Sequence, residues 1–145
     1  MLALIQRVTS ASVSIGGSVA GSISGGLLLL LGIEKSDTEQ QADRLLQKVL
    51  AYRVFADAEG KMNLSLRDVQ GGLLVVSQFT LAANTDSGLR PSFSSAKAPA
   101  EAEQLYNYFL KAARSSHASV AAGRFGADMQ VALVNDGPVT FLLKS

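Results

Sequence analysis

The sequence contains no cysteine, and its 145 residues include a single histidine, His117. A chain without cysteine has no thiol nucleophile, no redox pair and no cysteine-bearing zinc site, and one histidine cannot form a helical His-x-x-x-His metal site. We therefore expect no metal and no cofactor. The absence of cysteine also suits a reducing compartment.

Long apolar runs and an excess of charge are missing too. The longest apolar run, residues 27–33, is far shorter than the roughly 20 residues that a membrane-spanning helix needs. Residues 1–7 lack the basic segment and the long apolar stretch of a signal peptide. The net charge is only +1, so no overall field attracts nucleic acid or membranes. We expect a cytoplasmic protein that binds neither membranes nor DNA, and RNA binding would require a local basic patch.

What the chain does have is enough apolar side chain, 48% of its residues, to build one domain over residues 1–145 with its own core. Apolar and β-branched runs indicate strands, and Gly16-Gly17 indicates a tight hairpin turn. The predicted strands cover residues 2–8, 12–24, 27–33, 73–76, 129–134 and 139–143.

Two helices are expected. In the first, apolar residues recur at helical spacing from Ala42 to Leu50, Ser36 or Asp37 is the predicted N-cap, and the end is predicted near residues 52–55. These features predict an amphipathic helix with one buried face.

The second predicted helix starts with Pro99 in its first turn and carries apolar residues along one side as far as Ala113. The polar stretch before it, residues 84–97, is predicted to be a long loop of the kind that is often functional. Hairpins at both ends of the chain and only two helices argue against a doubly wound sheet. We expect an α/β (α+β) domain with a mixed or antiparallel, curved, barrel-like sheet and two main helices.

The common catalytic signatures are absent. There is no Gly-x-Ser-x-Gly, no Walker loop and no Gly-x-Gly-x-x-Gly. His117 follows the second helix in a polar stretch, where a solvated helix-end residue is favoured over the base of a serine triad. The carboxylates are scattered, and Asp57 and Glu59 flank a turn, where acidic residues are ordinary.

Two segments are less ordinary. In Ser77-Gln78-Phe79-Thr80-Leu81, polar side chains extend a strand that should be buried, which indicates either a site or satisfied side chains where a strand leaves the core. Asn135-Asp136-Gly137-Pro138-Val139-Thr140, taken alone, is predicted to be a hairpin turn between the last two strands.

Taken together, the two segments resemble the signature pair of the D-aminoacyl-tRNA deacylases, in the bacterial and eukaryotic branch of that family. The resemblance extends along the whole chain. It includes Ala3-Leu4-Ile5-Gln6-Arg7-Val8, Glu59-Gly60-Lys61-Met62-Asn63-Leu64, Gly88-Leu89-Arg90-Pro91-Ser92-Phe93 and Gly123-Arg124-Phe125.

The resemblance implies a homodimeric hydrolase that cleaves the ester between a D-amino acid, or glycine on mischarged tRNA, and the 3′-terminal adenosine of tRNA. The active sites would lie at the subunit interface, with Ser77, Gln78, Phe79 and Thr80 as the catalytic segment. The Gly137-Pro138 pair of one chain, joined by a cis peptide bond, would enter the pocket of the other chain and select the D enantiomer.

The residues leave the mechanism open. No base is visible that would activate Thr80 as a nucleophile, so we favour an oxyanion hole made by backbone N–H groups around Phe79 and Thr80, with help from the substrate's ribose 2′-OH. Phe79 either stacks on the terminal adenine or belongs to the core. Arg7 is a candidate to brace the Gly-Pro segment through its guanidinium donors.

Candidates for contact with the tRNA backbone are Arg90, Lys97 and Arg124. The rival interpretation is a non-catalytic, dimeric module that binds a tRNA end or an amino acid. A general esterase is a third possibility, which the missing triad disfavours.

Overall fold

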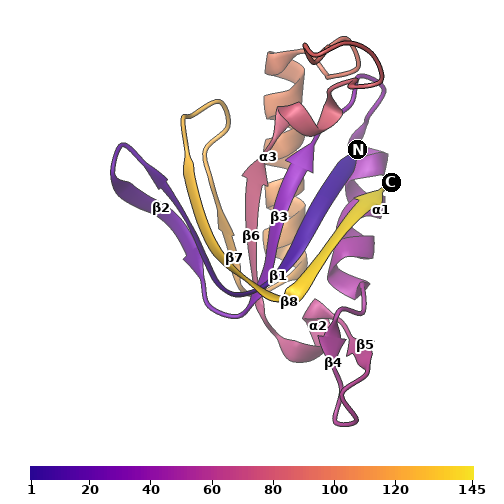
Figure 1. The fold of residues 1–145 in the computed structure, drawn as a ribbon. Coiled ribbons are helices and arrows are strands. Elements are labelled where there is room, and N and C mark those ends of the chain that lie inside the picture. The colour runs from indigo at the N-terminus through magenta and orange to yellow at the C-terminus, as the bar shows by residue number, and fades with distance from the viewer.

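The computed structural model describes residues 1–145, which form a strongly curved mixed sheet with two long helices on one face (Figure 1). Its strand order is β2-β1-β3-β6-β7, and β8 also pairs with β1. The parallel pairs are β3 with β6 and β6 with β7, and the remaining pairs in this sheet are antiparallel. The sheet strands are β1 (Leu2–Ile15), β2 (Ser18–Ile23), β3 (Gly26–Gly32), β6 (Gly72–Ser77), β7 (Val120–Ala122) and β8 (Gln130–Lys144).

The predicted fold class, a curved mixed sheet with two main helices, is confirmed. The helices are α1 (Glu39–Ala51), the one-turn α2 (Leu66–Val69) and α3 (Pro99–Ser116), and a 3₁₀ helix, η1 (Phe79–Ala82), follows β6. A small hairpin of β4 (Phe55–Ala56) and β5 (Met62–Leu64) projects from the lower end of the molecule (Figure 1). None of these helices combines the length and the apolar composition of a membrane-spanning segment.

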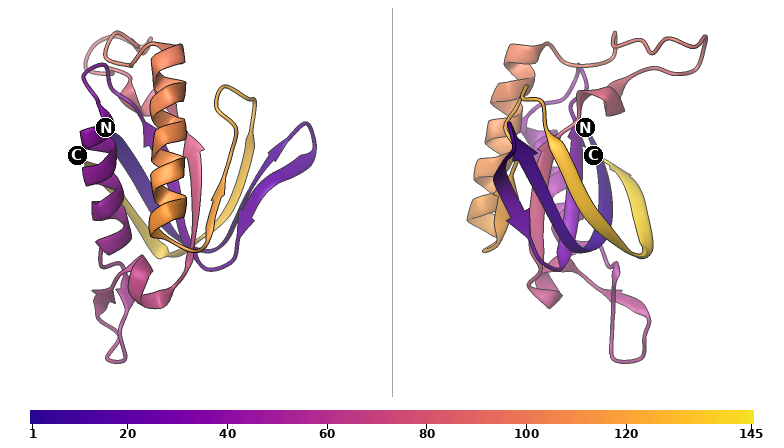
Figure 2. Two further views of the ribbon diagram at one scale, coloured as in Figure 1. Left: turned by 180° about the vertical axis from the view of Figure 1, so that it is seen from behind. Right: turned by 60° about the vertical axis from the view of Figure 1, so that its left-hand side comes forward.

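Glycines allow the sheet to curl towards a barrel. Gly16 and Gly17 have φ values of 56° and 82°, the two positive values that a tight type I′ hairpin turn needs, so the predicted turn is confirmed. At the far ends of the sheet, β2 and β7 approach so closely that a Cβ on Gly21 would lie 2.9 Å from the carbonyl oxygen of Ala122. Figure 2 shows the resulting curve, in which β2 and the first half of β8 turn away from the helices.

Helix α1 buries the face that the sequence predicts: Ala42, Leu45, Leu46, Val49 and Leu50 are buried. Its N-cap, however, is Thr38, whose side chain forms a capping box with Gln41, so the prediction of Ser36 or Asp37 is wrong. Asp37 instead accepts a hydrogen bond from the Met1 ammonium group at 2.5 Å.

Two apolar clusters lie on opposite faces of the sheet. The larger lies under α1 and α3, and α3 begins with Pro99 at its first turn, as predicted. The smaller lies on the concave face, where β1, β3 and β6 contribute Val8, Ala11, Val13, Leu28, Leu74 and Val76. Burial on both faces explains why residues 27–31 are a continuous apolar run.

The two predicted closing strands are one strand, β8, and the hairpin turn predicted between them is wrong. β8 runs antiparallel to β1 along both of its halves. Gln6 lies opposite Thr140 and Val8 opposite Asn135, so the single residue Arg7 faces the four residues 136–139. The turn-like sequence therefore forms a bulge, the Gly-Pro loop (residues 136–139), because both flanks pair with β1 rather than with each other.

Candidate functional site

β6 ends at Ser77, and the predicted continuation of the strand to Leu81 is wrong. The chain instead turns into η1 over the end of β3, where the Gln78 amide donates to the Leu31 carbonyl at 2.8 Å. Gly32 permits this path, because a Cβ there would lie only 2.8 Å from the Cβ of Leu81. The turn carries Gln78, Phe79 and Thr80 out of the core.

The side chains of this turn are available to a ligand. Phe79 is 60% exposed and its ring lies 5.0 Å from that of Phe93, so the alternative that Phe79 belongs to the core is wrong. The Thr80 hydroxyl group accepts a hydrogen bond from Gln78 Nε2 at 2.5 Å. Because an amide N–H cannot accept the hydroxyl proton, this contact orients Thr80 without activating it as a nucleophile.

The backbone of the turn also presents donors. Leu81 N–H donates to the Gln78 carbonyl and Ala83 N–H to the Thr80 carbonyl, both at 3.2 Å. Phe79 and Thr80 supply the first two amides of η1, and a helix leaves its first N–H groups without an acceptor of its own. Two neighbouring N–H groups therefore lie beside the exposed Phe79 ring.

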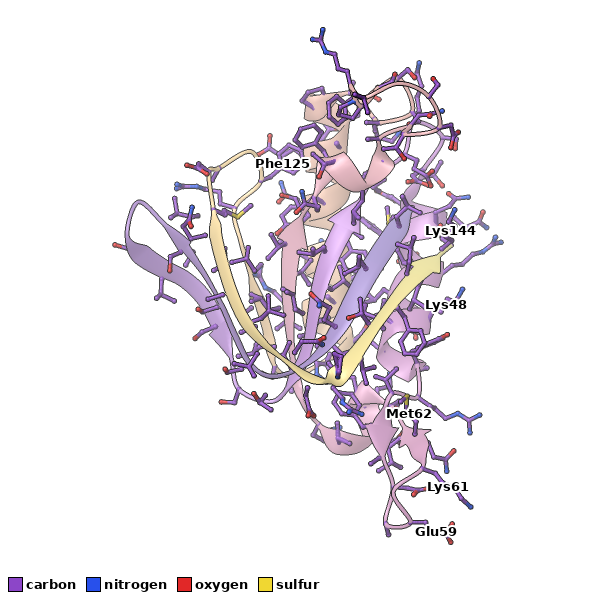
Figure 3. The ribbon with its side chains drawn as sticks, viewed as in Figure 1. Lys48, Glu59, Lys61, Met62, Phe125 and Lys144 are labelled. Carbon is purple, nitrogen blue, oxygen red and sulfur yellow. The ribbon has the colours of Figure 1, made fainter.

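A mainly apolar pocket of about 450 Å³ lies at this end of the sheet. One wall comes from the end of β6 and η1, another from the segment that joins β7 to β8, and a third from the segment that enters α3. The polar groups of Ser77 and Gln78 line it, together with Val76, Phe79, Ala96, Lys97, Pro99, Ala102, Phe125, Gly126, Ala127, Met129 and Val131. Figure 3 shows Phe125 on the loop before β8, at the upper end of the molecule.

The three predicted basic contacts differ in their surroundings. Lys97 lines the pocket, but its side chain is only 13% exposed, its Nζ donates to the Lys35 carbonyl at 2.9 Å, and it lies 4.0 Å from a Glu101 oxygen. Arg90, on the long loop, and Arg124, next to the pocket wall, are both exposed. Arg90 and Arg124 are thus better placed than Lys97 to meet a phosphate.

The Gly-Pro loop lies at the opposite end of the sheet from this pocket. Its neighbour Asn135 pairs with Val8, Val8 with Gly26 and Gly26 with Gly72, the first residue of β6. Ser77 is five residues further along β6, which at about 3.3 Å per residue is roughly 16 Å away. The loop therefore does not line the pocket of its own chain.

Arg7 contacts the Gly-Pro loop directly. Its Nε lies 3.2 Å from both the carbonyl oxygen and Oδ2 of Asp136, and its Nη1 donates to the Val54 carbonyl at 2.6 Å. The Gly137-Pro138 peptide bond is cis, and Gly137 has a φ of +122°. A Cβ at Gly137 would lie 2.9 Å from an Arg7 nitrogen, so the loop requires glycine there.

Asn135 is a second brace, which sequence reasoning missed. Its Nδ2 donates to the Arg7 carbonyl at 2.9 Å and to the Val139 carbonyl at 3.0 Å, so one amide group joins β1 to the far side of the loop. Both N–H donors of the amide are used. The only signal in the sequence is an asparagine at the start of the Asn-Asp-Gly-Pro segment, a position that is also typical of a turn.

His117 is not the solvated helix-end residue that the sequence predicts. It is 7% exposed, and its Nε2 lies 2.6 Å from the Gly71 carbonyl oxygen, just before β6. It therefore lies at the end of β6 remote from the pocket and serves the fold. No group of three or more histidine, aspartate or glutamate side chains is arranged to hold a metal ion.

Comparisons with known proteins agree on one family. The family model described as D-Tyr-tRNA(Tyr) deacylase matches residues 4–144. The D-aminoacyl-tRNA deacylase of Cellvibrio japonicus is 65% identical to this chain over 99% of both sequences. That of Pseudomonas aeruginosa is 64% identical over 100% of both sequences.

Two solved structures have the same fold. One, described as a c-Myc DNA unwinding element binding protein, has a TM-score of 0.96 at 42% identity and covers 100% of this chain and 99% of its own. The other, described as a probable eukaryotic D-amino acid tRNA deacylase, has a TM-score of 0.87 at 14% identity and covers 99% and 98%. At that low identity the second likeness shows the fold alone.

Proposed function

The chain belongs to the D-Tyr-tRNA(Tyr) deacylase family and is an enzyme with D-aminoacyl-tRNA deacylase activity, and on that premise we propose how its residues perform it. The substrate is the ester between a D-amino acid, or glycine on mischarged tRNA, and the 3′-terminal adenosine. The observation that carries the proposal is the pocket lined by Ser77, Gln78 and Phe79. Thr80 follows these lining residues, and the exposed Phe79 ring lies beside the unpaired backbone N–H groups of Phe79 and Thr80.

The terminal adenosine enters this pocket. An unpaired adenine at the end of a tRNA stacks readily on an aromatic side chain. The Phe79 ring is exposed at the pocket rim and packs against the ring of Phe93. Arg90 and Arg124 lie outside the pocket, where the phosphates of the incoming strand would pass.

The amides of Phe79 and Thr80 stabilise the reacting ester. Water adds to the ester carbonyl carbon, the carbonyl oxygen becomes an oxyanion that accepts from these N–H groups, and the bond to the ribose 3′-oxygen then breaks. The proton lost by water ends on that 3′-oxygen, and the neighbouring 2′-OH relays it. One donor of an oxyanion hole contributes about 2.7–4 kcal/mol, which is substantial for an ester that is already activated.

Selection of the D enantiomer comes from a second copy of the chain. The Gly-Pro loop lies far from its own pocket, and Arg7 and Asn135 hold it in a fixed shape, so it can act as a rigid probe for a partner's pocket. Backbone carbonyls on the loop would accept hydrogen bonds from the substrate's amino group and would collide with an L side chain. Glycine, with no side chain, would pass.

β8 offers the surface for such a dimer. It pairs with β1 alone, so its other edge has no strand beside it, and an open strand edge is a natural site for pairing with another chain. Val134 and Leu142 on this strand are 56% and 53% exposed, and Phe141 is 36% exposed. Covering these side chains with a second copy would bury apolar surface next to the Gly-Pro loop.

Mixing two inactive variants tests the exchange between subunits. Phe79→Glu disables the pocket, and Gly137→Val disables the loop because a valine does not fit the positive φ and the contact with Arg7. If the loop acts in trans, co-refolded mixtures contain dimers with one complete site and regain about a quarter of the wild-type rate. A mixture as inactive as its components would show that the loop does not act in trans.

Two rival interpretations make different predictions. A non-catalytic binding module would bind aminoacyl-tRNA without turnover, against the deacylase relatives at 65% identity. A general esterase would cleave simple esters and would not need the ribose 2′-OH. Replacing the terminal adenosine by 2′-deoxyadenosine should slow this enzyme strongly, and an unchanged rate would contradict the proposed role of the 2′-OH.

A further inference from the structure

Tyr106 is a buried tyrosine in α3 to which the proposed chemistry gives no role. It is 1% exposed, and its hydroxyl group lies 3.1 Å from two carbonyl oxygens, those of Val75 and Gly123. Phenylalanine would fill nearly the same volume in the apolar cluster, so the hydroxyl group serves these two carbonyls rather than the packing. One O–H thus links β6 to the segment that follows β7.

These carbonyls mark the place where the two facing walls of the pocket separate. β6 and β7 pair as far as Val75 and Ala122, and the Gly123 amide makes the last link by donating to the Val75 carbonyl at 3.0 Å. Beyond that link the two segments diverge. The segment from β6 continues to Ser77 and η1, and the segment from β7 forms the opposite wall, residues 125–131.

Tyr106 and Gly123 also contact that opposite wall. The rings of Tyr106 and Phe125 are tilted against each other with centroids 5.9 Å apart, and Phe125 lines the pocket. Met129, another lining residue, packs on Gly123 so closely that a Cβ there would lie 2.6 Å from its sulfur atom. A shift of Gly123 would therefore move both Phe125 and Met129.

We propose that Tyr106 is a positioning residue, which holds the wall of residues 125–131 at the distance from η1 that fits the aminoacyl-adenosine end of the substrate. This inference rests on the proposed function of the pocket. Burial raises the pKa of Tyr106 to about 12, so the hydroxyl group keeps its proton and donates at any physiological pH.

Tyr106→Phe tests the inference, and Tyr108→Phe is its matched control. Tyr108 lies two residues away on the same helix, and its hydroxyl group donates to the exposed carboxylate of Asp43 instead. For hydrolysis of D-Tyr-tRNA, we expect Tyr106→Phe to raise KM about fivefold, the factor that one net hydrogen bond contributes, with kcat within about twofold of wild type. Tyr108→Phe should change neither constant.

A second variant reaches the same wall without touching the hydroxyl group. Phe125→Leu removes the ring that Tyr106 supports and should also raise KM more than it lowers kcat. Thermal unfolding of each variant separates a loss of fold from a change in the pocket.

The outcomes are distinct. Wild-type kinetic constants in Tyr106→Phe together with a lowered unfolding temperature would mean a purely structural role and overturn the inference, as would a normal KM in Phe125→Leu. A wild-type protein that does not hydrolyse D-Tyr-tRNA would overturn the proposed function and, with it, this inference.

Discussion

Replacing Asn135 by aspartate should lower the selectivity of the enzyme for the D over the L ester without unfolding the protein. The substitution keeps the size of the side chain but turns the donating amide nitrogen into a carboxylate oxygen. That oxygen would face the Arg7 and Val139 carbonyls, at the 2.9 and 3.0 Å that now separate donor from acceptor. The variant loses both hydrogen bonds and adds repulsion between oxygens.

The magnitude follows from the two lost bonds. A neutral hydrogen bond contributes about 1 kcal/mol net, so the braced shape of the Gly-Pro loop should lose at least about 2 kcal/mol relative to other shapes. Since each 1.4 kcal/mol is about a factor of ten, we expect kcat/KM for the D ester to fall by roughly 30-fold. The L ester, which the loop excludes, should not become slower, so the ratio of the two rates should fall by a similar factor.

The assay is deacylation of matched D-Tyr-tRNA and L-Tyr-tRNA by wild type, Asn135→Asp and the control Asn63→Asp. Asn63 accepts a hydrogen bond from Arg53 through Oδ1, which an aspartate would also accept, so the control should behave as wild type. Gel filtration reports whether each variant keeps its assembly state. A folded Asn135→Asp protein with the wild-type ratio of rates would refute the idea that the braced loop governs selection.

Three further predictions follow from the site and its surroundings. Thr80→Ala should keep activity within about tenfold of wild type, because Thr80 has no base to activate it, and a trapped acyl-Thr80 intermediate in the wild-type enzyme would contradict this. Arg124→Glu should raise KM for tRNA and reduce the salt dependence of binding by about one unit of slope, whereas unchanged binding at all salt concentrations would remove Arg124 from the interface. The pKa of Tyr106 is raised from 10.0 to about 12, so its contribution to stability is complete below pH 10 and is lost as the pH rises towards 12. Unfolding midpoints measured from pH 9 to 12 should therefore fall less steeply in Tyr106→Phe than in wild type.

Local patterns predicted those parts of the fold that depend on neighbours in sequence. The buried face of α1 follows from helical spacing, the position of Pro99 from its fixed φ, and the first hairpin from the positive φ of Gly16 and Gly17. In each case a few adjacent residues carry the physical cause.

Other features depend on contacts between distant segments, and the sequence could not reveal them. Residues 135–138 have the composition of a turn, yet Asn135 pairs with Val8 and residues 136–139 form a bulge, because β1 is long enough to pair with both flanks. His117 is buried because its ring reaches the Gly71 carbonyl, 46 residues away. The short α2, β4, β5 and β7 are too brief to give a periodic signal.

The candidate site also has one part that adjacent residues predict and another that depends on contacts between distant segments. The segment from Ser77 to Thr80 could be singled out from sequence because polar residues follow a buried strand, but its turn into η1 depends on the tight contact between Gly32 and Leu81. Within the opposite wall of the pocket, residues 125–131, the sequence predicts only the start of a strand at residue 129, and no local pattern places this wall beside Phe79. Its place beside Phe79 arises only when the sheet curls.

The decisive measurement is the hydrolysis of D-Tyr-tRNA and L-Tyr-tRNA, followed side by side at low enzyme concentration and without added metal. We expect rapid loss of the D ester while the L ester is spared. Equal loss of both esters would contradict selection by the Gly-Pro loop, and binding without loss of either would contradict the proposed catalysis.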